Sequence, residues 1–170
     1  GGTVTEVRDD QVWAFGHPFL GGGGFRIPMA RAHVLTVLPS QMNSFKFFSV
    51  GESIGSFEAD RSRGIWGRLG EVAPMVPVRV TVNGQDYRFR SVRHPSLSPF
   101  LIAYLVQSSQ AARGRLFGEQ TITMSIELRF ADSEPVRYRE IFSSGEAPAQ
   151  ATAVAAALVG YLEASAFEVP

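Results

Sequence analysis

Glycine divides the first part of the chain, up to about Val92, into short extended runs. The runs over 45–50, 53–59 and 64–69 are bounded or interrupted by Gly51, Gly55, Gly64, Gly67 and Gly70. Short strands with frequent glycine are typical of a β-barrel or sandwich, because tight turns need a residue that tolerates positive φ. The pattern therefore predicts a β-rich, barrel-like unit over residues 1–94.

A hairpin over 77–92 is the clearest single element in this part of the sequence. Apolar residues alternate with polar ones on both sides of Asn83-Gly84. Asn-Gly is the favoured two-residue hairpin turn, since both residues tolerate positive φ. The resulting register predicts three cross-strand pairs: Val80 with Tyr87, Val78 with Phe89, and Arg79 with Arg88.

The remainder of the chain combines helices with strands. Ser98-Pro99 predicts a helix start with Ser98 as N-cap, and apolar residues alternate over 122–130. The predicted elements are a helix from Ser98 to near Gly114, strands over 122–130 and 136–142, and a helix that Pro148 opens. We therefore predict an α-β-β-α unit over 95–170 and an α+β chain overall, with the boundary near His94-Pro95.

Composition excludes several classes of function. The charges of sixteen basic and sixteen acidic residues cancel, so the net charge gives the chain no general electrostatic attraction to nucleic acid. The chain has no cysteine, which excludes disulfides, thiolate nucleophiles and zinc-thiolate sites. No run of eighteen apolar residues exists to span a membrane. The sequence starts at Gly1 without a methionine or signal peptide, so we expect a fragment or processed product of a longer protein.

His17 is the first candidate for chemistry. It follows an apolar run that ends at Phe15, between Gly16 and Pro18. An imidazole is the side chain best suited to proton transfer near neutral pH. His17 is either a general base or a histidine whose ring hydrogen-bonds to backbone at a turn. We expect His33 to be a half-buried strand residue and His94 a loop residue. No spacing resembles metal ligation, and neither metal nor cofactor is predicted.

Three further features have both a chemical and a structural interpretation. Asp60 could orient a histidine as the third member of a triad, or it could be a turn aspartate paired with Arg61 or Arg63, which we favour. The run Gly51–Gly55 matches G-x-S-x-G, but an extended run follows where that motif needs a helix, so we interpret the match as accidental. The run Gly21–Gly24 leads into Phe25-Arg26-Ile27-Pro28, which favours a flexible loop over a phosphate-binding one.

Several short motifs in fixed order carry a family resemblance, which covers residues 1–80 densely. They are Gly2-Thr3-Val4-Thr5, Ala14-Phe15-Gly16-His17-Pro18-Phe19, Pro28-Met29, Ala32, Ser44-Phe45-Lys46, Gly55 through Asp60-Arg61, Gly64-Ile65-Trp66-Gly67-Arg68-Leu69-Gly70, and Met75-Val76-Pro77-Val78. This order resembles the SpoIVB peptidase family, and in particular its large extracytoplasmic bacterial members outside sporulation.

The resemblance implies a serine endopeptidase of trypsin-like, two-barrel ancestry, located outside the cytoplasm. It gives His17 the role of general base and places Gly21–Gly24 beside the substrate cleft. The family's Gly-Met-Ser-Gly-Ser-Pro motif is absent from this chain, so the serine is expected upstream, and Asp60 is the candidate acid partner within it. The implied partners are a polypeptide substrate and the missing upstream part of the same protein.

Two other readings stay open. The chain could be a non-catalytic scaffold or interaction module that keeps a peptidase-like fold. It could also be a small-ligand-binding β-barrel with Trp13 and Trp66 at its mouth.

Overall fold

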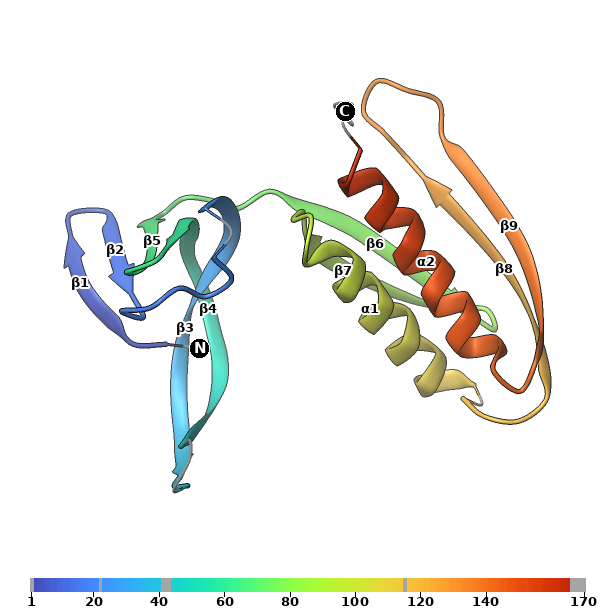
Figure 1. The fold of residues 1–170 in the computed structure, drawn as a ribbon, viewed down its shortest axis with the longest axis horizontal. Helices are drawn as coiled ribbons and strands as arrows, with labels where there is room; N and C mark the ends of the chain where they lie inside the picture. Colours follow the sequence, from blue (N-terminus) through green and yellow to red (C-terminus); the bar gives the residue numbers. More distant parts are fainter. Residues whose placement is uncertain (1, 22, 41–43, 115, 166–170) are drawn as a thin grey trace. The chain divides into compact units, whose positions relative to one another are not determined.

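The computed structural model describes residues 2–21, 23–40, 44–114 and 116–165. The chain divides between Pro74 and Met75 into two compact units, shown in Figure 1. The sequence predicts this boundary near His94-Pro95. The difference arises because the hairpin before His94 packs against the helix that follows it.

The first unit is an open, entirely antiparallel sheet. Its strand order is β1-β2-β5-β4-β3, so β1 and β3 lie at the two edges. The closed barrel predicted from the sequence is therefore not found among the described residues. The strands are β1 (Val4–Arg8), β2 (Gln11–Ala14), β3 (Gly23–Leu38), β4 (Phe45–Arg61) and β5 (Gly64–Leu69).

Glycines that the sequence suggested as breaks lie inside a continuous strand. β4 runs through Gly51 and Gly55 without interruption. A Cβ on Gly55 would lie 2.0 Å from the carbonyl oxygen of Arg68 on β5. A Cβ on Gly67 would lie 2.4 Å from the Ser56 carbonyl oxygen. These glycines let β4 and β5 approach each other closely, which is a different use of glycine from turning the chain.

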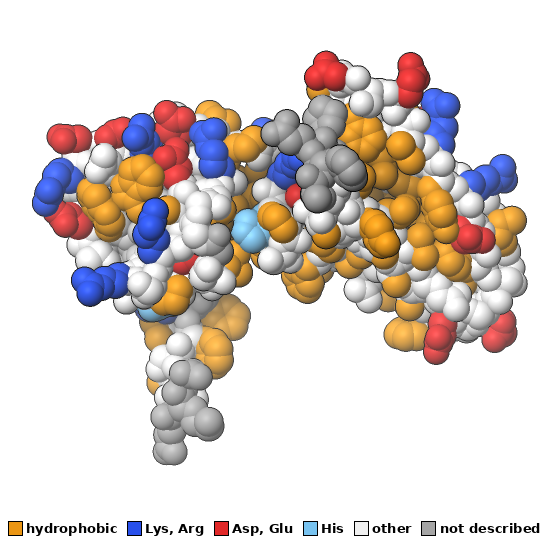
Figure 2. Space-filling view, turned by 45° about the horizontal axis from the view of Figure 1, so that its top comes forward, with side chains coloured by type: hydrophobic (Ala, Val, Ile, Leu, Met, Phe, Trp, Pro, Cys, Tyr) orange, Lys and Arg blue, Asp and Glu red, His pale blue; other side chains and the backbone are white. Residues whose placement is uncertain are grey.

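The far halves of β3 and β4 form a two-stranded extension, which we call the arm (residues 30–38 and 45–53). Within the described chain β5 pairs with β4 only from Gly55 to Arg61, so the two arm strands pair only with each other. Figure 2 shows hydrophobic side chains along this hairpin. Eight of its large apolar side chains are between 39% and 72% exposed: Val34, Leu35, Val37, Leu38, Phe45, Phe47, Phe48 and Val50.

The second unit consists of two hairpins, each followed by a helix. α1 packs on β6, β7 and α2, and α2 packs on β8 and β9. The predicted α-β-β-α succession is present and is preceded by the first hairpin. The elements are β6 (Met75–Val82), β7 (Gln85–Val92), α1 (Ser98–Arg113), β8 (Gln120–Leu128), β9 (Val136–Ser144) and α2 (Ala147–Glu163). The three cross-strand pairs predicted around Asn83-Gly84 are confirmed.

The turn before α1 differs from the prediction. Leu97, and not Ser98, occupies the N-cap position of the helix. The buried Ser98 hydroxyl instead accepts a hydrogen bond from the His94 N–H, at 2.8 Å. His94 itself is only 8% exposed, and its Nδ1 accepts the Ser96 N–H at 3.2 Å. Ser98 and His94 therefore fasten the turn between β7 and α1 from inside.

We expect Gly55→Ala to lower the free energy of unfolding of the first unit by about 1–3 kcal/mol, because the new Cβ must displace the Arg68 carbonyl. Gly24→Ala is the matched control, since a Cβ there meets nothing within 4 Å, and it should change stability by less than about 0.5 kcal/mol. Urea unfolding followed by tryptophan fluorescence measures the first unit alone, because Trp13 and Trp66 are the chain's two tryptophans. Equal stability of the two variants would refute the close-approach explanation.

Candidate functional site

His17 lies on the connection between β2 and β3, and we call residues 15–21 the His17 loop. The chain reverses at Phe15 and Gly16, which have consecutive positive φ values of 79° and 68°. Glycine adopts this conformation readily, but Phe15 does so at a cost of about 1–3 kcal/mol. The rest of the site must therefore hold Phe15 in place.

Four contacts hold Phe15. Its N–H donates to the carbonyl oxygen of Thr3 at 2.9 Å. Its ring meets the ring of Phe19 edge-on, with centroids 5.8 Å apart, and lies 6.3 Å from the ring of Phe57 on β4. The ring also packs directly against Gly2, where a Cβ would lie 2.0 Å from ring carbon Cδ1. The strained residue is thus anchored to β4 and to the residues just before β1.

Asp60, at the end of β4, holds the other half of the loop. Its side chain is buried, at 1% exposure. One carboxylate oxygen accepts the Phe19 N–H at 2.8 Å, and the other accepts the N–H groups of Leu20 and of Gly21, the latter at 2.6 Å. A buried carboxylate is costly unless donors surround it, and three N–H groups supply them. Asp60 therefore fixes the backbone directly after His17-Pro18.

The His17 ring is exposed on this anchored loop. Its Nδ1 lies 2.7 Å from the carbonyl oxygen of Pro18. Because a carbonyl can only accept, Nδ1 must carry the proton, which leaves the lone pair of the neutral ring on Nε2. The ring centroid also lies 5.8 Å from that of Phe15. The loop thus presents an imidazole in the tautomer that a general base requires.

His17 and Asp60 both contribute to this loop, but no hydrogen bond between their side chains is seen among the described residues. The described hydrogen bond of the His17 ring goes to Pro18 and not to Asp60. Asp60 binds loop backbone, so the bonds seen do not match the expected turn aspartate paired with Arg61 or Arg63. His33, expected to be half-buried, is exposed on the arm. The role of Asp60 as a loop anchor is what sequence reasoning missed.

The structure also locates the G-x-S-x-G match and the glycine run. The G-x-S-x-G match lies within β4, with strand on both sides of Ser53, so the interpretation of an accidental match is confirmed. Gly23 and Gly24 open β3, so the glycine run leads into a strand and not into a helix. Gly22 lies outside the described residues. The sequence signal that could have identified Asp60 as the loop anchor is an aspartate at the end of an extended run, in a chain that also has a glycine-rich loop.

The described residues contain no group of three or more histidine, aspartate or glutamate side chains placed to hold a metal ion. Within the same residues, no helix has the length and apolar character needed to cross a membrane.

Comparisons with known proteins found no relative. Neither the scan against protein-family models nor the searches of curated proteins and of solved structures gave a match.

We expect Asp60→Asn to loosen the His17 loop. The Asn side chain replaces one carboxylate oxygen by an NH₂ group, which cannot accept hydrogen bonds from the loop N–H groups. The free energy of unfolding should therefore fall by about 2 kcal/mol. Hydrogen exchange at Phe19, Leu20 and Gly21 should become faster. Asp10→Asn, at an exposed aspartate in the β1–β2 turn, is the matched control and should leave both measurements unchanged. Unaltered exchange at the three amides in Asp60→Asn would contradict the anchoring role.

Proposed function

We propose that this chain supplies the general-base histidine of a serine endopeptidase, whose nucleophilic serine lies outside these residues. The observation that carries the proposal is the exposed His17 ring, with Nδ1 held by the Pro18 carbonyl at 2.7 Å. The motifs over residues 1–80 that resemble those of the SpoIVB peptidase family support the same role for this histidine.

The proposed chemistry follows from the tautomer. Nε2 of His17 takes the proton from the serine hydroxyl as its oxygen attacks the scissile carbonyl. The imidazolium then donates that proton to the leaving amine, and the same cycle with water releases the acyl group. The Pro18 carbonyl keeps Nδ1 protonated throughout.

The Pro18 carbonyl performs one of the two tasks of a triad acid. It orients the ring and selects the tautomer, as a carboxylate would, but it brings no full negative charge to the imidazolium. The Asp60 carboxylate is engaged with loop amides. We therefore propose Asp60 as a positioning residue for the loop, and a charged partner for His17, where the mechanism uses one, comes from outside these residues.

The test of this function is active-site labelling of the full-length protein by a fluorophosphonate, which reacts with an activated serine. His17→Ala should slow labelling by about 10⁴-fold or more, because the serine loses its base. His33→Ala, at another exposed histidine of the first unit, should label like the unaltered protein. Labelling that survives His17→Ala would reject the peptidase proposal.

The arm favours a second candidate function, that of an interaction module without catalysis. Many large apolar side chains exposed along one two-stranded hairpin are typical of a surface that another molecule covers. In this reading His17 is a turn residue, and its replacement affects stability only. The two candidates therefore differ in what His17→Ala does to the full-length protein.

We expect the arm's apolar side chains to contribute surface and not stability. Leu35 and Val50 are 71% and 72% exposed, so the double variant Leu35→Ser with Val50→Ser should shift the unfolding free energy by less than about 1 kcal/mol. Fluorescence of the apolar dye ANS should fall in the same variant, since the dye binds exposed apolar surface. A large loss of stability would show that the arm is part of the core and not a free surface.

A further inference from the structure

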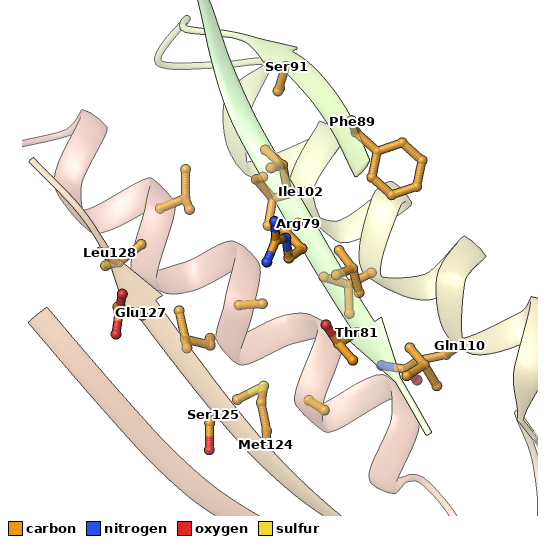
Figure 3. Close-up of a pocket in the computed structure, with 18 of the residues that line it drawn as sticks. Arg79, Thr81, Phe89, Ser91, Ile102, Gln110, Met124, Ser125, Glu127 and Leu128 are labelled. Atoms are coloured by element: carbon orange, nitrogen blue, oxygen red, sulfur yellow. The ribbon is translucent and has the colours of Figure 1, made fainter. Parts of the chain in front are cut away.

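A long groove runs through the second unit between β6 and β8. Its volume is about 1170 Å³, and residues of β6 and β8 line it along nearly the whole length of both strands. Apolar side chains of α1 and α2 form the floor, among them Ile102, Val106 and Val159. Figure 3 shows Arg79 and Thr81 of β6 on one side, and Met124, Ser125 and Leu128 of β8 on the other.

Among the described residues, no strand pairs with the groove side of either wall. Within them β6 pairs with β7 and β8 pairs with β9, as separate two-stranded sheets, and Figure 1 shows β6 and β8 as the inner strands. In a hairpin closed by a two-residue turn, hydrogen-bonded and non-hydrogen-bonded pairs alternate away from the turn. Counting from Val82 and Gln85, the backbone groups of Pro77, Arg79 and Thr81 point away from β7. Pro77 fits this register, because it has no N–H to give to the ladder.

The apolar layer beneath the groove is not closed. Within the described part of the second unit, the only fully buried apolar side chains belong to Ala147, Pro148, Ala151 and Ala155. The large apolar residues of the strands, such as Val80, Ile122 and Ile126, are only half-buried. A unit of this size ordinarily covers residues of this type completely. All three residues line the groove, so its walls carry apolar surface that this unit leaves partly exposed.

Positive charge prevails around the groove. Its lining includes four arginines and two glutamates: Arg79, Arg88, Arg93, Arg129, Glu127 and Glu163. Hydrogen bonds from Arg137 and Arg129 hold the pKa of the Glu127 carboxyl below its usual range, so it is ionised and already paired at neutral pH. Arg129 is itself bound to Glu127, and Arg79 lies 4.0 Å from Asp86. The lining still carries two more arginines than glutamates, which favours an occupant with some negative charge.

We propose that this groove binds an extended segment of a partner polypeptide, apolar at every second residue and polar or acidic between, as a strand between β6 and β8. The added strand would join the two hairpins into one five-stranded sheet over the helix pair. Only an extended backbone offers donors and acceptors to both walls while directing alternate side chains at the apolar floor. A helix or a lipid chain would leave the strand edges unpaired.

This inference does not depend on the proposed peptidase activity. The groove belongs to the second unit, whereas His17 and its loop belong to the first. An experiment that rejects one proposal therefore does not bear on the other.

The first test uses an eight-residue peptide, Glu-Val-Thr-Val-Glu-Ile-Thr-Val, capped at both ends and titrated into the chain by calorimetry. We expect saturable one-to-one binding. N-methylation of two alternate residues removes backbone donors on one edge and should weaken binding at least tenfold. A peptide of the same composition with its apolar residues grouped together should weaken it similarly. Equal affinity of the parent and N-methylated peptides, or no binding at millimolar peptide, would overturn the proposal.

The second test changes the wall of the groove. Thr81→Pro removes an N–H that faces the groove and leaves the β6–β7 ladder intact, as Pro77 already does, and peptide affinity should fall about fivefold. Thr81→Val is the matched control: it loses the same hydroxyl, which hydrogen-bonds Asp86 at 2.6 Å, but keeps the N–H and should keep the affinity. Thermal unfolding verifies that both variants fold.

Sedimentation of the chain alone tests whether a second copy of this chain occupies the groove. The partner proposal would be overturned by a dimer that persists in excess peptide but dissociates in the Thr81→Pro variant. That result would assign the groove to a second copy of the chain.

Discussion

The first unit depends on one buried negative charge. The Asp60 carboxylate comes from the end of β4, one of the inner strands of the sheet, and it binds three consecutive N–H groups of the loop that leaves β2. Burial of a carboxylate is unfavourable by several kcal/mol unless it is compensated, so this side chain stabilises the fold only in the presence of those donors. Loop and strand therefore order each other. The strained φ of Phe15 persists because the chain is fixed on both sides of it, by Thr3 before the turn and by Asp60 after it.

The sequence predicted the local elements well, for local reasons. The hairpin around Asn83-Gly84 was predicted in its register because turn chemistry and alternation both act within a few residues. Helices that carry proline in the first turn were likewise predicted near their true starts. Each of these features has its physical cause within the segment that shows it.

The errors concern features whose cause is distant in the sequence. Gly55 looked like a break, yet it is glycine because the Arg68 carbonyl of another strand passes beside it. Asp60 was predicted to be a turn residue paired with Arg61 or Arg63, yet its carboxylate accepts hydrogen bonds from N–H groups about forty positions earlier. The prediction of a closed barrel was wrong for the same reason. Closure requires the two edge strands of the sheet to pair with each other, and no local sequence pattern determines that pairing. The histidine could be singled out from the sequence as a candidate, whereas the anchoring of its loop by Asp60 could not.

Unpaired strand edges occur in both units, in different settings. The arm's edges belong to strands whose side chains are exposed and apolar, so edge and side chains together offer a surface to anything extended or flat. The groove's edges face each other across a floor of helices, so only an occupant that is itself a strand can satisfy both. Selectivity thus differs: the arm presents apolar surface without specifying a register, whereas the groove imposes strand direction, alternation and length. Of the two, only the groove has enough geometric constraint to distinguish one polypeptide segment from another.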